Sequence, residues 1–349
     1  MGTRHIAAAL LLSTSSALAL DCGTFTFPDC SGPDQQLHPS FPSPPREGGF
    51  GGGECRAEKV PVVFVHGNAD RAISWDSPSG DGGPSVYAAL KAGGYRDCEL
   101  FGLTYLSPEE RAHPVKNRHD PEHLKQVSGF IEAVVKHSGQ PKVDLVTHSL
   151  GSSMALAALD QADGWGLVRR FVNIAGGLRG LGSCLAAGPM NPLSPTCFGG
   201  NVAQGTFGFH PDLPLGVNMW TGDQGKRSLR QAPLRHPEVL FYTLTAGEQD
   251  QVHCSTMQAL ETCVKGPLFD PAPNVRAQLN LGAGTRASSK DFDWEDKSRR
   301  NNDGGDKDGV GHYKARNNSG AIILNFLNTD CSGLSCAAGY PGAVEEARP

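Results

Sequence analysis

The chain has 349 residues, of which 31 are lysine or arginine and 36 are aspartate or glutamate, so its formal net charge at pH 7 is −5. A chain with this acidic balance does not favour nucleic acid, so we expect no nucleic-acid partner. Hydrophobic residues make up 38% of the chain, which at this length is enough for a large core and excludes global disorder. The 44 glycines and 25 prolines follow no repeat, which excludes a fibrous or solenoid fold.

The N-terminus carries an apolar run, Ile6 to Leu12, preceded by Arg4 and followed by Ala17-Leu18-Ala19. This arrangement is typical of a signal peptide cleaved after Ala19, and the run is too short to span a bilayer. We therefore expect residues 1–19 to be removed, the mature chain to be secreted and extracellular, and no segment to span a membrane. A buried helix is the alternative interpretation of the run.

All 10 cysteines follow the predicted cleavage site, and an even number of cysteines in an oxidising compartment indicates disulfide bonds. Pairing near neighbours leaves Cys55 and Cys98 for each other. The spacing does not favour zinc, which uses clustered pairs of ligands, so we predict no metal. The expected pairs are Cys22–Cys30, Cys55–Cys98, Cys184–Cys197, Cys254–Cys263 and Cys331–Cys336.

Residues 20–57 are rich in proline and glycine without hydrophobic periodicity, which predicts an irregular N-terminal wrap. After them, strand-like and helix-like stretches alternate, as in βαβ units. The expected fold class is therefore α/β, with a mostly parallel central sheet and helices on both faces. We predict strands at 60–65, 99–105, 142–147, 171–175, 239–245 and 275–281, and helices at 85–92, 121–137 and 320–327. Residues 178–237 form a long stretch of glycine, proline and scattered aromatics, which indicates a lid or cap insertion over the substrate entrance.

The clearest chemical motif is Thr147-His148-Ser149-Leu150-Gly151, between an apolar strand and a helix-forming segment. A strand, a sharp turn with serine at its apex and a helix make a nucleophile elbow, whose flanking residues must be small because strand and helix come close. Gly151 meets this requirement, whereas Thr147 is larger than the usual glycine. The alternative is a serine that only caps a helix.

The first buried strand ends in His66-Gly67-Asn68, where an elbow of this kind has its second oxyanion donor. The other donor is the amide that follows the nucleophile. We therefore predict an oxyanion hole made by the backbone N–H groups of Asn68 and Leu150. Taken alone, the His-Gly pair is equally compatible with a simple turn.

The acid and base of a triad are expected later in the chain, in the order Ser, Asp, His. Asp250 follows the strand at 239–245, with Glu248 as its nearest competitor. For the base we choose His312, which precedes the last helix, over His253, which would need a very tight loop to face an acid three residues away. The predicted triad is Ser149, Asp250 and His312, and it needs no cofactor.

Three other features are assigned supporting or neutral roles. His66 and His148 precede Asp250, so we expect them to pack around the elbow and the oxyanion turn. The stretch Asp303–Gly309 lacks the first carboxylate and the distal glutamate of a calcium loop, which favours a glycine-rich hinge before His312. Asn317-Asn318-Ser319 is a glycosylation sequon, relevant only in a eukaryotic secretory pathway, with a plain surface loop as the alternative.

Longer strings accompany these motifs: Cys22-Gly23-Thr24, Gly48–Gly53, His66–Asn68, Gly102–Ser107, Asn173–Gly180, Asp250–Val252, Gly309–His312 and Thr329–Leu334. Together they resemble the extracellular polyhydroxyalkanoate depolymerases that attack amorphous short-chain polyester, which are lipase-like α/β-hydrolases. The resemblance spans nearly the whole mature chain. It implies a single α/β-hydrolase domain over residues 20–349, the same triad, and hydrolysis of poly(3-hydroxybutyrate) or its oligomers.

The sequence thus predicts a secreted serine ester hydrolase that acts on an aliphatic polyester or another ester, and we expect it to be a monomer. A triacylglycerol lipase or general carboxylesterase is the alternative with the same chemistry. A hydrolase-like protein that binds polymer without cleaving it is the alternative from another class.

Overall fold

The computed structural model describes residues 34–37, 47–53, 55–76, 83–179, 181, 196, 228–247, 250, 252–253, 266–282 and 311–349. Several sequence predictions lie outside these residues: the signal peptide 1–19, most of the insertion 178–237, the hinge 303–309 and three of the five cysteine pairs. Among the described residues, no helix has both the length and the apolar character that a bilayer crossing requires.

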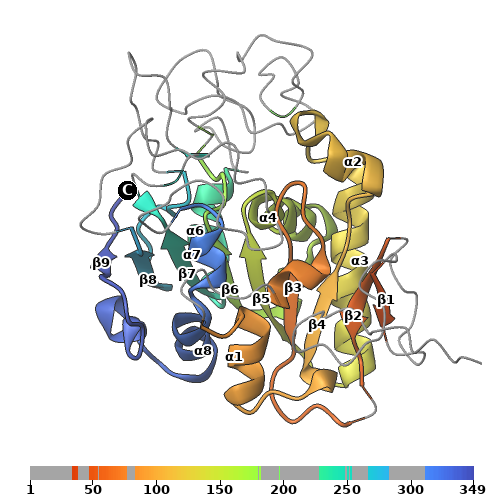
Figure 1. The fold of residues 1–349 in the computed structure, drawn as a ribbon, viewed down its shortest axis with the longest axis horizontal. Helices are drawn as coiled ribbons and strands as arrows, with labels where there is room; N and C mark the ends of the chain where they lie inside the picture. The colour runs from red at the N-terminus through yellow and green to blue at the C-terminus, as the bar shows by residue number, and fades with distance from the viewer. Residues whose placement is uncertain are drawn as a thin grey trace, which may run out of the picture.

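The described strands form one nine-stranded sheet in the order β1-β2-β4-β3-β5-β6-β7-β8-β9 (Figure 1). From β4 to β8 all neighbours are parallel, whereas β2 runs antiparallel to β4 and β9 antiparallel to β8. The mostly parallel sheet confirms the predicted α/β class. The strands are β1 (Asp34–Leu37), β2 (Gly48–Gly51), β3 (Val62–Val65), β4 (Leu100–Leu103), β5 (Val143–His148), β6 (Val168–Ile174), β7 (Leu240–Thr245), β8 (Val275–Asn280) and β9 (Glu345–Glu346).

Two helical layers cover the sheet, one on each face. Helices α3 (Pro121–Ser138) and α4 (Leu150–Ala162) bury their apolar sides in one core, and α1 (Val86–Ala92) and α8 (Gly320–Asn328) bury theirs in the other. Because both faces are covered, every residue of β3 and β5 is buried, which explains why β3 is a continuous apolar run. A mostly parallel sheet between two helical layers, with an elbow after its central strand, is the α/β-hydrolase fold.

Helix α3 illustrates how local sequence sets these boundaries. The carboxylate of Asp120 accepts a hydrogen bond from the Glu122 amide at 3.1 Å, Pro121 occupies the first turn, and Gly139 ends the helix with a φ of 70°. The buried side includes Leu124, Val127, Ile131 and Val134, at the spacing of one helix face. The start at Pro121 matches the sequence prediction, and the helix ends one residue later than predicted.

The remaining elements are short and lie between the main ones. They are α2 (Pro108–Ala112), α6 (Ala232–Arg235), α7 (Lys314–Asn317), and the 3₁₀ turns η1 (Ala72–Asp76), η2 (Asp97–Glu99), η3 (Pro114–Lys116), η4 (Gly164–Leu167), η6 (Leu229–Gln231) and η8 (Gly333–Ala337).

The expected irregular wrap at 20–57 is wrong for two segments, since β1 and β2 extend the sheet. Strand β2 reads Gly-Gly-Phe-Gly, a composition that intrinsic propensity disfavours in strands. It pairs with β4 because its glycines allow a very close approach: a Cβ on Gly49 would lie 2.2 Å from the carbonyl oxygen of Gly102. Strand β9, only two residues long, was likewise not predicted.

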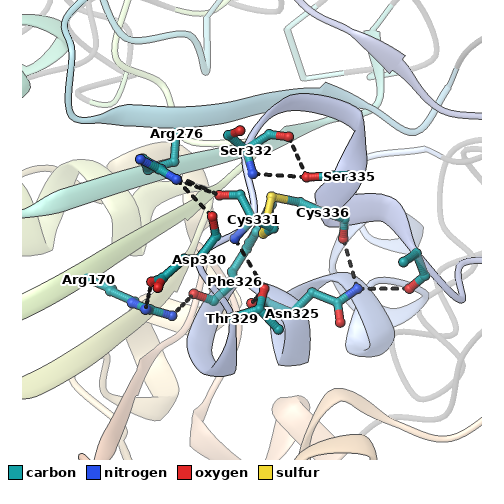
Figure 2. The surroundings of a disulfide bond; sticks show 11 residues. Arg170, Arg276, Asn325, Phe326, Thr329, Asp330, Cys331, Ser332, Ser335 and Cys336 are labelled. Atoms are coloured by element: carbon teal, nitrogen blue, oxygen red, sulfur yellow. Dashed lines mark hydrogen bonds and ion pairs between the residues drawn. A yellow bond between two sulfur atoms is a disulfide. The ribbon is translucent and has the colours of Figure 1, made fainter.

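Two of the predicted disulfides lie among the described residues and are formed, Cys55–Cys98 and Cys331–Cys336. Figure 2 shows the second bond beside the end of α8. There the Asn325 side chain donates to the carbonyls of Cys336 (3.0 Å) and Ala338 (2.8 Å), and Arg276 donates to the carbonyl of Asp330 at 2.8 Å. The C-terminal segment is thereby fastened to α8 and to β8.

The two bonds differ in the length of chain that they close, with separations of 43 and 5 residues. Loop-closure entropy then predicts a loss in the free energy of unfolding of about 4 kcal/mol for Cys55→Ser/Cys98→Ser and about 2 kcal/mol for Cys331→Ser/Cys336→Ser. Urea denaturation of the two double variants measures both. Equal losses, or the larger loss for the shorter loop, would contradict the entropic account.

Candidate active site

Ser149 stands at the sharp turn between β5 and α4, as predicted. Its backbone has φ 54° and ψ −125°, a conformation that non-glycine residues rarely adopt. The residue is half-buried, so its hydroxyl group is not sealed in the core. A strained serine at the carboxyl end of a central parallel strand is the geometry of a nucleophile elbow.

The elbow packs directly against the turn that follows β3. A Cβ on Gly151 would lie 2.2 Å from the carbonyl oxygen of His66, and one on Gly67 would lie 3.0 Å from the Cβ of Ser149. Thr147, the unusual residue of the motif, fits because its hydroxyl donates to the carbonyl of Val172 at 2.8 Å and lies 2.8 Å from the Ser152 hydroxyl. The small residues of both turns thus allow elbow and oxyanion turn to meet.

Asp250 and His312, predicted as acid and base, are brought together although 62 residues separate them. The Nδ1 atom of His312 lies 3.0 and 2.9 Å from the two carboxylate oxygens, and both side chains are buried. The amides of Val252 and His253 donate to the same carboxylate at 2.9 and 3.1 Å. Burial opposes ionisation of the Asp250 carboxyl, but the neighbouring histidines and these hydrogen bonds lower its pKa to about 2.

A further consequence concerns the tautomer of His312. An ionised carboxylate only accepts hydrogen bonds, so the Nδ1 atom of His312 carries the proton of this contact. The Nε2 atom is then left as an acceptor, which is the state that a general base for a serine requires.

The chain turns tightly after Asp250, so that the ring of His253 lies close to that of His312. The sequence prediction had considered such a turn too tight. The ring of His253 is buried 5.9 Å from that of His312, yet its Nε2 atom donates to the carbonyl of Ala175 at 2.9 Å and is 4.0 Å from the carboxylate. His253 therefore supports Asp250 through its backbone, and the choice of His312 as the partner of the carboxylate agrees with the structure.

His148 connects Ser149 to this pair. Its Nε2 atom is 3.1 Å from the carbonyl oxygen of His312, and the two rings are 4.8 Å apart. Within the described residues, the contact between the elbow and the Asp250–His312 pair is made by His148. The Ser149 hydroxyl itself forms no hydrogen bond to His312 there. Such serine–histidine contacts commonly tighten only in the complex with substrate.

The predicted oxyanion donors are the N–H group of Asn68, in the turn after β3, and that of Leu150, directly after Ser149. Among the hydrogen bonds of the described residues, none engages the N–H of Asn68 or of Leu150. The Asn68 side chain instead holds the turn: it donates to the Pro114 carbonyl at 2.9 Å and accepts from the Ala69 amide (3.0 Å) and the Asn117 side chain (2.6 Å). Asn117 was not singled out from the sequence, because its role depends on a contact across 49 residues.

His66 packs beneath the same turn, as expected. Its Nδ1 atom bonds the Gly67 carbonyl at 2.8 Å, its Nε2 atom accepts the Tyr105 amide at 3.2 Å, and its ring stacks on Tyr105. Complete burial lowers the pKa of His66 to about 4, so the ring is neutral at neutral pH. Burial also lowers the pKa of His148 and of His253.

Asp250, His253 and His312 also form a set whose ligand atoms lie within 4.8 Å of one another. In the described part of the chain, these three residues are the set that could provide three protein ligands to a metal ion. The Asp250 carboxylate is hydrogen-bonded to His312 Nδ1, and the Nε2 atom of His253 to the Ala175 carbonyl, an arrangement that suits proton transfer.

The sequon at Asn317 is not on a surface loop. Asn317 is the last residue of α7, is 2% exposed, and accepts a hydrogen bond from the Nε atom of Arg316 at 2.8 Å. A glycan on this side chain would have no room in the folded chain.

Comparison with known proteins agrees with this geometry. Residues 59–205 match the family of class 2 lipases, a region that covers less than half of the chain and includes β3, the oxyanion turn and the elbow. This match supports a lipase-like α/β-hydrolase fold. Among curated proteins, none matches this chain.

Several solved structures are similar in outline. Lipase B of Aspergillus fumigatus is 14% identical with a TM-score of 0.42, over 79% of this chain and 54% of its own, so this chain spans about half the length of that lipase. The mature lipase BlEst2 of Bacillus licheniformis is 16% identical (TM-score 0.35, 58% and 72% covered), and the esterase RhEst1 of Rhodococcus is 20% identical (0.33, 56% and 74%). The strand order and the elbow define the α/β-hydrolase fold of this chain.

Close packing at the elbow predicts the effect of adding a single methyl group. Gly151→Ala places a Cβ against the backbone of β3, which should cost about 1–3 kcal/mol of stability and lower ester hydrolysis by displacing Ser149. Gly129→Ala is the matched control, because nothing lies within 4 Å of a Cβ there and alanine favours the helix. Thermal unfolding and activity assays compare them; a Gly151→Ala protein that behaves like Gly129→Ala would refute the packing argument.

Burial lowers the pKa of His66, His148 and His253, which predicts a loss of stability in mild acid. Unfolded histidine binds a proton below about pH 6.5, whereas folded His66 binds it only near pH 4, so unfolding takes up protons between these values and lower pH favours unfolding. His66 therefore contributes a slope of up to about 1.4 kcal/mol per pH unit in this range, and His148 and His253 act in the same direction. The pKa of Asp250 is lowered instead, so its contribution is retained above about pH 4 and lost only as the pH falls toward 2.

Urea denaturation between pH 7 and pH 5 measures this slope. His253→Gln keeps a donor for the Ala175 carbonyl and should make this slope smaller, because burial lowers the pKa of His253. A free energy of unfolding that does not change between pH 7 and pH 5 would contradict the neutral, buried state of these rings.

Proposed function

We propose that this chain is a secreted serine carboxylic-ester hydrolase that depolymerises poly(3-hydroxybutyrate) or a related aliphatic polyester to hydroxyacid oligomers. The observation that carries the proposal is the buried Asp250–His312 pair beside a strained serine elbow. The resemblance of the sequence to polyhydroxyalkanoate depolymerases supports the polyester substrate. The predicted signal peptide and the two disulfides support secretion.

The proposed reaction begins with attack of the Ser149 hydroxyl oxygen on the ester carbonyl carbon. His312 accepts the serine proton at Nε2, while its Nδ1–H remains hydrogen-bonded to Asp250. The negative charge of Asp250 stabilises the imidazolium. The carbonyl oxygen becomes an oxyanion that the N–H groups of Leu150 and Asn68 stabilise, and each such donor is worth about 3 kcal/mol in the transition state.

Collapse of this intermediate breaks the ester bond. The alcohol leaves with the proton from His312, and the acyl group remains on Ser149. Water then attacks the acyl-enzyme, giving its proton to His312, and the second collapse releases the hydroxyacid end and restores the serine. The proposed reaction therefore requires only the ester, water and the side chains of this protein.

A triacylglycerol lipase is the second candidate, and the class 2 lipase match favours it. The two candidates share every catalytic step and differ in the acyl and alcohol portions of the substrate. Acid release from amorphous poly(3-hydroxybutyrate), triolein and short p-nitrophenyl esters separates them. We expect release from the polyester and from the short esters; hydrolysis of triolein alone would replace the polyester proposal with the lipase.

Labelling with a fluorophosphonate tests the nucleophile. The wild-type protein should be labelled, Ser149→Ala should not be, and its hydrolysis should fall by several orders of magnitude because the acyl-enzyme does not form. Ser128→Ala, in the middle of α3, should be labelled like the wild type. Labelling that persists in Ser149→Ala would show that another residue is the nucleophile.

A further inference from the structure

A buried ion pair joins the oxyanion turn to the segment that carries His312. The Nη1 atom of Arg316 donates to the Oδ2 atom of Asp70 in a short contact. The Arg316 side chain is 0% exposed and that of Asp70 is 9% exposed. The two residues are 246 positions apart in the sequence, so the contact ties together two segments that only the fold brings close.

Each end of the pair stands next to a residue of the proposed active site. Asp70 follows Asn68 by two residues, with Ala69 between them at a φ of 59°, a conformation that costs free energy for alanine. Arg316 follows His312 by four residues in the turn that leads into α7, where the amides of Ala315 and Arg316 donate to the carbonyls of Gly311 (2.9 Å) and Tyr313 (3.1 Å).

The surroundings fix the guanidinium in place. Its Nε atom donates to the Asn317 side chain at 2.8 Å, and its central carbon lies 5.7 Å from the ring centre of Trp75 and 6.0 Å from that of Tyr313. Asp70 also accepts a short hydrogen bond from the Ser74 hydroxyl. In the described structure the Nη2 atom of Arg316 has no partner, so Asp70 is the one anionic group that compensates this buried cation.

A buried ion pair adds little to the free energy of unfolding, because the desolvation of the two charges costs about as much as their Coulomb attraction contributes. It does impose one relative position on the segments that it joins. We propose that Asp70 and Arg316 are positioning residues, which hold the oxyanion turn and the His312 turn in register so that donor and base act on one carbonyl group. This inference rests on the proposed ester hydrolysis.

Asp70→Asn tests the proposal, since it removes the charge and keeps the shape. With a soluble p-nitrophenyl ester at a temperature far below unfolding, we expect kcat to fall by about 10- to 100-fold while KM changes by less than about twofold. Arg316→Lys keeps the charge but loses the planar fork, and should have an intermediate kcat. Asp144→Asn is the matched control: Asp144 is as deeply buried and pairs with Arg169, but at the opposite end of β5 from Ser149.

The double variant Asp70→Asn/Arg316→Met separates positioning from stability. Removing both charges avoids an unpaired buried cation, so the double variant should fold at least as stably as Asp70→Asn, and it should still have the low kcat because the tie is gone. Asp144→Asn should lose stability and keep its kcat. Recovery of both stability and kcat in the double variant, or a wild-type kcat in Asp70→Asn, would overturn the proposal.

A second readout does not depend on hydrolysis. The proton shared by His312 Nδ1 and Asp250 should give a low-field imidazole resonance in the ¹H NMR spectrum, assigned by its loss in His312→Gln. We expect this resonance to shift or broaden in Asp70→Asn and to be unchanged in Asp144→Asn. A wild-type protein without esterase activity would refute the proposed function, whereas an unchanged resonance in Asp70→Asn would refute the positioning role.

Discussion

The structure of the site depends on one buried negative charge. The Asp250 carboxylate has no exposure to water, a state that is unfavourable unless hydrogen bonds and opposite charge replace the solvent. Two backbone amides of its own loop and the His312 ring supply them. The loop after β7 must therefore fold tightly around its own acid, and the segment before α8 must return across the carboxyl edge of the sheet to complete the shell.

The same edge of the sheet concentrates the conformational strain. Ser149, Ala69 and Ala175 all have a positive φ, and all three follow parallel strands at their carboxyl ends. The two helical layers and the fully buried strands supply the stability that makes these conformations tolerable. The predicted nucleophile and the predicted oxyanion turn thus both lie on strained backbone at one edge of the sheet, and a preorganised backbone is the condition for electrostatic stabilisation of an oxyanion.

The sequence predicts the central part of this arrangement well, because the signals there are local. A continuous apolar run identifies β3, the Asp120 and Gly139 caps delimit α3, and the elbow motif places Ser149 between a strand and a helix. The order of triad residues and their place after strands were enough to choose Asp250 and His312, which the structure joins by hydrogen bonds.

Features that rest on contacts between distant segments were not accessible in this way. Strand β2 forms because glycine removes the obstacle to Gly102, and nothing in Gly-Gly-Phe-Gly indicates a strand. His253 was rejected as facing the acid on a loop-length argument, although the loop is tight enough and the competing acceptor is the Ala175 carbonyl. The Asn117 and Arg316 contacts span 49 and 246 residues, and a single sequence carries no sign of them.

The buried sequon at Asn317 has a consequence for any host that attaches sugars to nascent chains. Oligosaccharide transfer occurs on unfolded polypeptide, so modification and closure of α7 compete for the same side chain. A chain that receives the sugar first cannot seat Asn317 against Arg316, and its His312 turn stays open. Glycosylation of Asn317 would then mark molecules that were modified before they folded. The yield of folded protein from such a host would depend on the folding rate.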